Sequence, residues 1–190
     1  MYIVPIDDSV ELVLLPVTAA EEVSTLVQRN RERLAPWMNW VAEPFTAERA
    51  RDWLRECIDE FVTGRRIGTY LRVDGELAGW AALDIRGHVG VVGYWLDAAY
   101  EGRGLASRAV TALLDVGFGQ RELERLELRT VPANARSQRV ASRLGFQYEG
   151  TLRHAVARPQ ADGQVFDDEL LYALLAGEWV AARRAAVAGQ

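Results

Sequence analysis

The sequence predicts a mixed α/β fold: a mostly antiparallel central sheet of about six to seven strands, flanked by helices. Its apolar patterns run in the order strand, two helices, three strands, helix, strand, helix, two strands. The three consecutive strands are joined by short turns, which favours antiparallel pairing. The order lacks the regular strand–helix alternation of a doubly wound parallel sheet.

Length and composition fit one domain. The 190 residues are 49% hydrophobic, which is enough to bury a core without metals or disulfides. No internal repeat, low-complexity tract or proline-rich linker marks a boundary. We expect residues 1–190 to form one domain, of which about 176–190 make a C-terminal helical tail.

The same composition argues against several classes of function. One cysteine, Cys57, cannot form an internal disulfide, and two histidines are too few for a familiar metal site, so no metal is expected. A net charge of −5 disfavours nucleic acid and anionic lipid and suits a cationic partner, although mild acidity also serves solubility alone. No apolar segment approaches the roughly 20 residues that cross a bilayer, so we expect a cytoplasmic protein without membrane contact.

The first half of the chain predicts one strand and two helices. Val10–Val17 is an apolar run, and Thr18–Glu21 has the form of a capping box that opens a helix reaching about Arg33. A threonine then precedes the amphipathic segment Ala47–Val62, which Gly64 closes as a C-cap.

The second half begins with a three-stranded meander that includes an Asp74-Gly75 turn; its strands are Ile67–Val73, Leu77–Ile85 and Val89–Leu96. Apolar spacing then predicts a helix that begins at Leu105 and ends near Gly117 or Gly119. The remaining elements are a strand over Leu126–Val131, a helix over Ser137–Leu144 that Gly145 stops, and two strands flanking Asp162-Gly163.

A glycine-rich turn lies between the third strand of the meander and the next helix. Gly102-Arg-Gly104 removes side chains where successive backbone N–H groups can converge on an anion, which makes a pyrophosphate site plausible. The alternative is a tight turn without a ligand. The turn matches neither a dinucleotide-binding fingerprint nor a P-loop.

Several motifs in order resemble the GNAT acetyltransferases, and most closely the RimJ/RimL-type branch that acetylates the N-termini of ribosomal proteins. They are the phrase Gly-Tyr-Trp-Leu-Asp from Gly93, the Gly-x-Gly-x-Ala turn, Asn134-x-x-Ser137, and Leu-Gly-Phe146 followed by Glu149-Gly150. Fainter similarity extends over Asn30–Trp40 and from Gly163 to Trp179, so it covers most of the chain. The resemblance implies a GNAT-like sheet that splays between its fourth and fifth strands.

The resemblance also implies a cosubstrate, acetyl-CoA. Its pantetheine arm would lie along Trp95 and Leu96, and Asn134 would bond to that arm or to adjacent backbone. The pyrophosphate would sit on the backbone amides of Gly102, Arg103, Gly104, Leu105, Ala106 and Ser107. The guanidinium groups of Arg103 and Arg108 would add positive charge there, or would be solvated surface groups.

Ser137 and Asn134 are the catalytic candidates. By resemblance the Ser137 hydroxyl would lie beside the coenzyme sulfur, where a hydroxyl can stabilise or protonate the departing thiolate. The alternative for Ser137 is a helix cap.

Two departures from the family pattern concern the coenzyme and the base. Glu101 stands where the superfamily usually has Gln or Arg, so we expect weaker coenzyme affinity. Val156 stands where RimL-type enzymes tend to have a glutamate base. The base is therefore unassigned: the candidates are Asp84, Glu149 and Asp168, with a water relay as the alternative. We expect His154 to be a strand-face residue.

The acceptor is expected to be a primary amine, namely the N-terminal α-amine of a protein or peptide. Trp37 and Trp40 resemble the aromatic pair that lines the acceptor cleft in related enzymes, with core packing as the alternative. Two other functions stay open: acetylation of a small-molecule amine such as an antibiotic, polyamine or amino acid, and a non-catalytic module that binds coenzyme A. The resemblance further suggests a homodimer.

Overall fold

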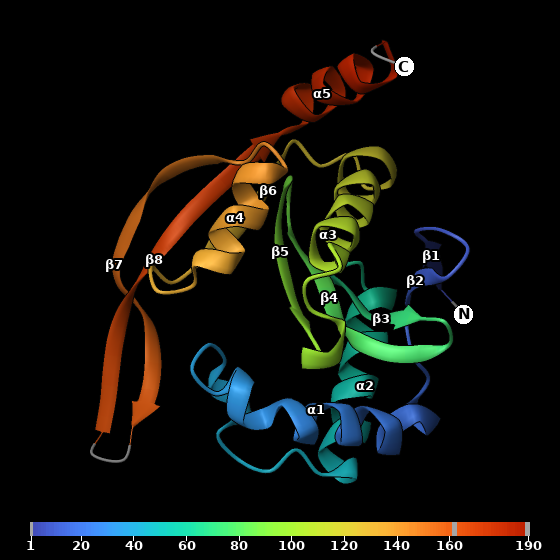
Figure 1. Cartoon of the computed structure of the whole chain (residues 1–190), viewed down its shortest axis with the longest axis vertical. Helices are drawn as coiled ribbons and strands as arrows, with labels where there is room; N and C mark the ends of the chain where they lie inside the picture. The colour runs from blue at the N-terminus through green and yellow to red at the C-terminus, as the bar shows by residue number, and fades with distance from the viewer. Residues whose placement is uncertain (1, 161–162, 189–190) are drawn as a thin grey trace.

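The computed structural model describes residues 2–160 and 163–188, and these form one eight-stranded sheet with helices on both faces (Figure 1). The strands are β1 (Ile3–Pro5), β2 (Val10–Val13), β3 (Arg66–Val73), β4 (Glu76–Arg86), β5 (Val89–Leu96), β6 (Arg125–Thr130), β7 (Gln147–Gln160) and β8 (Gly163–Leu175). The α-helices are α1 (Ala20–Leu34), α2 (Ala47–Val62), α3 (Leu105–Asp115), α4 (Ala135–Arg143) and α5 (Ala176–Ala188).

The strands lie in the order β1-β2-β3-β4-β5-β6-β8-β7, and every neighbouring pair is antiparallel except β5 and β6. The predicted mixed, mostly antiparallel sheet is confirmed. It contains one strand more than the upper predicted number because β1 pairs with β2 at the edge. Three residues are too few to show an alternating pattern, so β1 escaped prediction.

The sheet splays where the prediction placed the splay. Pairing between β5 and β6 runs from Val89 opposite Arg125 to Val92 opposite Leu128 and then stops, although β5 continues to Leu96. These are the fourth and fifth of the predicted strands. The segment Gly93–Leu96, hereafter the splayed segment, is paired with β4 on one side only.

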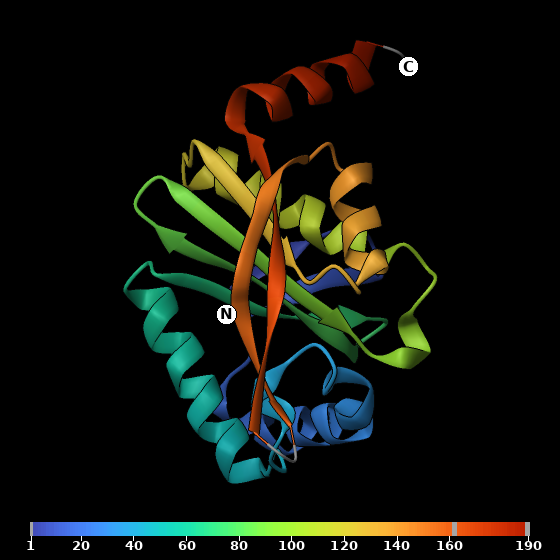
Figure 2. The same ribbon diagram turned by 90° about the vertical axis from the view of Figure 1, so that its left-hand side faces the viewer.

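The helices cover the two faces of the sheet in pairs. Figure 2 shows α1 and α2 on one side of the strands and α3 and α4 on the other. Neighbouring residues of β3 therefore enter different cores: Tyr70 packs in the core beneath α1 and α2, and Leu71 in the core beneath α3 and α4.

The predicted start of the first helix is wrong. Thr18 lies in a short 3₁₀ turn, Val17–Ala19, whose N-cap has no side-chain hydrogen bond, and α1 begins only at Ala20. The carbonyl of Pro16 accepts the N–H of Ala19, so backbone rather than a capping box satisfies this end. At the second helix the expectation holds: the Thr46 side chain accepts the N–H of Arg49, and Gly64 follows the helix with φ +71°.

The C-terminal elements follow the prediction. β7 and β8 form a long hairpin that reaches beyond the rest of the sheet (Figure 1). The expected turn at Asp162-Gly163 includes Asp162, which lies outside the described residues, as do the last two residues of the expected tail. Helix α5 is held by the Asp115 carboxylate at the end of α3, which accepts from Trp179 at 3.2 Å and Arg183 at 2.6 Å.

Candidate active site

The glycine-rich turn has the geometry of an anion site. Gly102 and Gly104 have φ of +76° and +71°, a left-handed backbone that other residues rarely adopt, and a Cβ at either position would meet nothing within 4 Å. Gly104 is the N-cap of α3. Among the residues described, no acceptor bonds to the amides from Gly102 to Ser107. Unused N–H groups at the start of a helix suit a phosphate group.

Four arginines surround this turn. Arg103 belongs to it and stacks on the Tyr100 ring at 5.2 Å. Arg33 and Arg136 both bond to the Glu101 carboxylate, and Arg143 donates to the Ser107 hydroxyl at 3.2 Å. Arg108, which the sequence placed among the phosphate candidates, instead pairs with Asp7 near the start of β2.

Glu101 bridges two parts of the site that are far apart in the sequence. It accepts from Arg33 of α1 at 2.6 Å and from Arg136 in the first turn of α4. Arg33 also donates to the carbonyl of Leu96 and to the Asn30 side chain, the latter at 3.0 Å. The negative charge of Glu101 would repel a diphosphate, which is the physical reason for the weaker coenzyme affinity expected from the sequence. The two arginines partly neutralise that charge, so the repulsion is smaller than Glu101 alone would cause.

Replacing Glu101 with glutamine should raise the affinity for acetyl-CoA about threefold to tenfold, a modest gain because the groups are partly solvent-exposed. The neutral side chain keeps its shape but leaves Arg33 and Arg136 uncompensated near the phosphates. Calorimetric titration at low and high salt checks this, since the gain should shrink as salt rises. Glu22→Gln, at the exposed far end of α1, is the matched control. Weaker binding by Glu101→Gln would mean that its positioning of the two arginines outweighs its repulsion.

Helix α1 fixes the backbone that leads into the turn. Asp97 follows β5, is only 4% exposed, and accepts from Arg29 and from the N–H of Ala99. Burial alone would raise the pKa of this carboxyl, but hydrogen bonds from Ala99, Asn30 and Arg29 bring it below its ordinary value. The ionised Asp97 therefore ties α1 to the end of the splayed segment.

Asn134 and Ser137 lie at the start of α4, beside the splay. The Asn134 side chain caps the helix by accepting the N–H of Ser137 at 3.1 Å. The reading of Ser137 as the cap is therefore wrong, since it lies inside the first helical turn. Its hydroxyl is 3.1 Å from the Tyr94 hydroxyl on β5.

Tyr94 was not among the residues predicted for the site, although it stands in the motif Gly93–Asp97. Burial raises the pKa of its phenol, and the hydrogen bond to Ser137 lowers it less, so the net shift is upward. Tyr94 therefore stays protonated at neutral pH and can donate its proton to Ser137. Strand alternation could have placed Tyr94 on the face opposite Trp95, but not against Ser137, 43 residues later.

The three candidate bases are all bound to other groups. Asp84 and Glu149 pair with Arg66 and Arg125, and the hydrogen bonds from Arg125 lower the pKa of the Glu149 carboxyl. Asp168 accepts the backbone N–H of His154 at 2.9 Å.

Two further positions on β7 bear on the search for a base. Val156 lies opposite Asp167 on β8 and carries no titratable group. His154 is exposed, with φ +53°, where the register of β7 against β8 shifts. We therefore add no base to the candidates that the sequence suggested.

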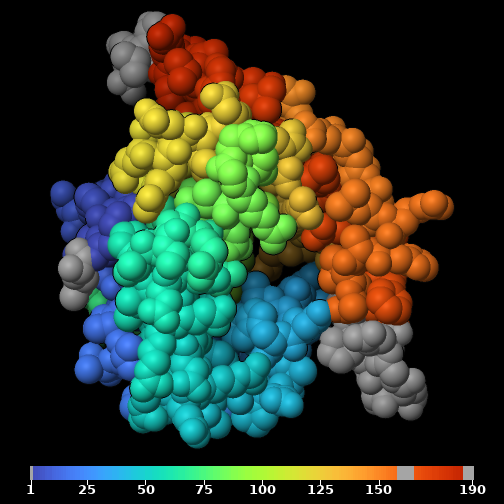
Figure 3. All heavy atoms as spheres, turned by 180° about the vertical axis from the view of Figure 1, so that it is seen from behind, coloured from blue at the N-terminus to red at the C-terminus, as the bar shows by residue number. Residues whose placement is uncertain are grey.

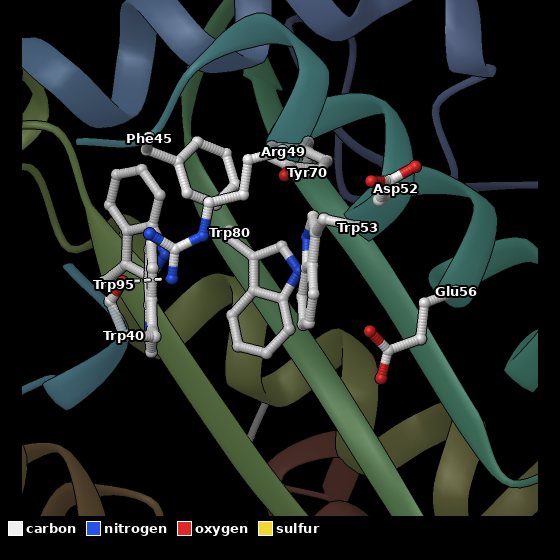
Figure 4. A pocket seen from close by; sticks show the side chains of 9 residues that line it. All are labelled: Trp40, Phe45, Arg49, Asp52, Trp53, Glu56, Tyr70, Trp80 and Trp95. Atoms are coloured by element: carbon white, nitrogen blue, oxygen red, sulfur yellow. Dashed lines mark hydrogen bonds between the residues drawn. The ribbon is translucent and has the colours of Figure 1, made fainter. Parts of the chain in front are cut away.

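A pocket of about 370 Å³ opens on the face covered by α1 and α2. This aromatic pocket is lined by Trp40, Phe45, Arg49, Asp52, Trp53, Glu56, Tyr70, Trp80 and Trp95 (Figure 4). Seen from that side, the surface is hollowed between α2, the segment after α1, the β4–β5 hairpin and the β7–β8 hairpin (Figure 3).

Of the two tryptophans predicted for the acceptor cleft, only one lines the aromatic pocket. Trp40 lines the aromatic pocket and packs edge-on to Phe45, with ring centroids 5.5 Å apart, whereas Trp37 is not among the lining residues. Both are about two-fifths exposed, at 39% and 41%, so core packing explains neither. The family resemblance places Trp95 beside the pantetheine arm of the coenzyme. In the structure the side chain of Trp95 lines the aromatic pocket.

The chain belongs to the GNAT acetyltransferase family. Residues 11–147 match the acetyltransferase (GNAT) domain. The protein named "Probable N-acetyltransferase YjcK" of Bacillus subtilis (strain 168) is 31% identical over 168 residues, which cover 85% of this chain and 91% of that protein. The ribosomal-protein-serine acetyltransferase of Escherichia coli (strain K12) is 26% identical over 90% of this chain and 94% of its own length.

A solved structure supports the same fold. The α-N-protein acetyltransferase RimL, determined in complex with coenzyme A, superposes with a TM-score of 0.84 and covers 92% of this chain and 98% of that one. At 22% identity this likeness concerns the fold. Among the described residues, no helix is long and apolar enough to span a membrane, and no group of three or more His, Cys, Asp or Glu side chains is placed to hold a metal ion.

Proposed function

We propose that this chain transfers the acetyl group of acetyl-CoA to the N-terminal α-amine of a protein or peptide. The observation that carries the proposal is the arrangement at the splay. A turn with unused backbone amides, Gly102–Ser107, begins one helix, and the hydroxyl pair Tyr94–Ser137 lies where β5 loses its partner strand. Family membership supports acetyl-CoA as the donor.

In the proposed complex the coenzyme lies between these two features. Its pyrophosphate would accept from the amides of Gly102–Ser107, with Arg103 nearby as a cation, and its pantetheine arm would follow Trp95 and Leu96. The Leu96 carbonyl already accepts from Arg33, so Arg33 must shift or share that oxygen. The thioester would then lie beside Ser137.

The transfer is a direct displacement at the thioester carbonyl. The neutral amine nitrogen attacks the carbonyl carbon, the C–S bond breaks, and the sulfur takes the electron pair. One proton leaves the nitrogen and one is gained by the sulfur, so the products are an amide and free coenzyme A. The Ser137 hydroxyl donates to the departing sulfur, Tyr94 replaces that proton through their hydrogen bond, and Tyr94 regains a proton from solvent before the next turnover. Holding the reactants together supplies much of the remaining rate.

We infer that the proton of the amine leaves through water. Asp84 and Glu149 are paired with arginines and Asp168 accepts a backbone N–H, so we assign the proton to none of them. A water molecule in the hollow of Figure 3 can carry the proton to solvent instead. Asn134 contributes by fixing the first turn of α4, and hence the position of Ser137.

The acceptor assignment rests on relatives whose names specify protein α-amines or ribosomal-protein serine. Small-molecule amines are the second candidate, favoured by the volume of about 370 Å³ and the aromatic lining of the aromatic pocket. A cytoplasmic location and a homodimer stay predictions.

The test incubates the protein with acetyl-CoA and a panel of peptides with free or blocked N-termini, followed by intact mass and fragment analysis. We expect acetylation confined to free α-amines. Acetylation of lysine side chains or small amines alone would favour the second candidate. Coenzyme binding without any acetylation would indicate a non-catalytic module.

A further inference from the structure

We propose that the aromatic pocket holds the body of the acceptor, and that the preferred acceptor is a primary aliphatic amine joined to an aromatic ring by a short alkyl linker. The amine can be the N-terminus of a peptide whose first residue is aromatic, or a free arylalkylamine. The inference rests on the proposed function, because it specifies which amine the site takes.

The shape of the pocket favours a planar group. Tyr70, Trp80 and Trp95 lie directly opposite one another on β3, β4 and β5, so their rings form a row across the sheet. The Trp53 ring lies 6.0 Å from that of Trp80, and Trp40 stands beside the row (Figure 4). A volume of about 370 Å³ lies within the range of pockets that enclose small ligands. The small side chain of serine or alanine would leave most of it filled with water.

Charge contributes less to recognition than the rings do. Asp52 and Glu56 stand one helical turn apart at the rim, but Asp52 pairs with Arg55 at 2.7 Å and Glu56 lies 3.8 Å from Arg66. Exposed pairs of this kind are weak and screened by salt. Arg49 is held by the Trp40 carbonyl at 2.8 Å, as the dashed line of Figure 4 shows. Stacking and burial of apolar surface therefore dominate.

The pocket adjoins the proposed reaction centre. Trp95 lies in the splayed segment, and the preceding residue, Tyr94, contacts Ser137 on the other face of the sheet. Trp95 thus borders both the pocket and the splay, so the amine of an acceptor whose ring lies in the pocket can extend along the splayed segment toward the thioester. Phenylalanine and tryptophan N-termini and phenethylamine carry the amine on a two-carbon linker from the ring, which leaves it free to extend in this way.

The test compares kcat/KM for peptides that differ only in their first residue, Phe or Trp against Ser or Ala, and for phenethylamine against propylamine. We expect the aromatic acceptor to be favoured at least about tenfold, as an apolar pocket can discriminate. Comparison of the peptides with the free amines shows whether the enzyme takes the aromatic group from a peptide N-terminus or from a small molecule. Equal or better turnover of the Ser and Ala peptides and of propylamine would overturn the inference.

Variants link this preference to the pocket. Trp40→Ala should remove most of it, Trp40→Phe should keep it, and Tyr148→Ala, which removes an exposed ring on β7, should leave it unchanged. An unchanged preference in a folded Trp40→Ala protein would contradict the inference.

Binding of phenethylamine, followed by tryptophan fluorescence with coenzyme A present, gives a readout independent of turnover. If no amine is acetylated but phenethylamine binds and Trp40→Ala abolishes that binding, the proposed function fails while the pocket assignment stands. Absence of binding by the wild type overturns the assignment.

Discussion

Replacing Gly104 with glutamate should lower the affinity for acetyl-CoA at least about 100-fold, which corresponds to about 2.7 kcal/mol of binding free energy. The new side chain projects from the left-handed N-cap of α3 into open space beside the unused amides. It would occupy the proposed pyrophosphate position and bring a like charge to it. Calorimetric titration with acetyl-CoA measures the loss.

The substitution also strains the backbone, so it needs a control with the same strain. Gly64 has the same φ of +71°, and a Cβ there also meets nothing within 4 Å, but it ends α2 on another part of the molecule. A side chain in this conformation costs about 1–3 kcal/mol of folding stability. Gly64→Glu should therefore lose similar stability while binding the coenzyme normally. Equal affinities in the two variants would show that the turn does not hold the pyrophosphate.

Replacing Ser137 with alanine should reduce kcat about 100-fold, the lower end of what a positioned proton donor contributes. The Kd for acetyl-CoA should stay within about twofold, because the phosphates are held elsewhere. Helix stability should change little, since Asn134 and not Ser137 caps α4. Steady-state kinetics with a saturating acceptor, together with calorimetry, separates the two effects.

Two further variants sharpen this prediction. Ser142→Ala makes the same change at an exposed position of α4 and should leave kcat unchanged. Tyr94→Phe removes the partner hydroxyl, and if the two groups act in series the double variant should be scarcely slower than Ser137→Ala alone. A kcat for Ser137→Ala close to that of the wild type would exclude Ser137 as the donor. If the double variant instead loses kcat by the product of the two single losses, Tyr94 acts independently of Ser137.

Local patterns in the sequence predicted most of the fold. The period of apolar residues located the long strands and helices, and Gly64 and Thr46 marked the ends of α2 correctly. The two wrong predictions concern short segments near the N-terminus. β1 has three residues, and Thr18 resembles a capping box while the backbone satisfies that helix end through a 3₁₀ turn. One sequence does not show which of two competing local hydrogen bonds forms.

The site was predictable only in part, because its contacts join distant segments. The motifs indicated Gly102, Gly104, Asn134 and Ser137. They did not indicate that Arg33 would reach Glu101 and the Leu96 carbonyl, 68 and 63 residues away. The aromatic pocket depends on strand register as well: Tyr70, Trp80 and Trp95 become neighbours only through the pairing of β3, β4 and β5. Packing of the whole sheet determines such register, and no local signal reports it.

Acetyl transfer to an amine at the splay between β5 and β6 can be observed directly. The most direct test is to incubate the protein with acetyl-CoA labelled in the acetyl group and a peptide with a free N-terminus, and to locate the label by fragment-ion mass spectrometry. We expect label on the α-nitrogen, release of free coenzyme A in equal amount, and a strong reduction of both by Ser137→Ala. Binding of acetyl-CoA by the folded protein without label on any amine of the peptide or of a small-amine panel would contradict it.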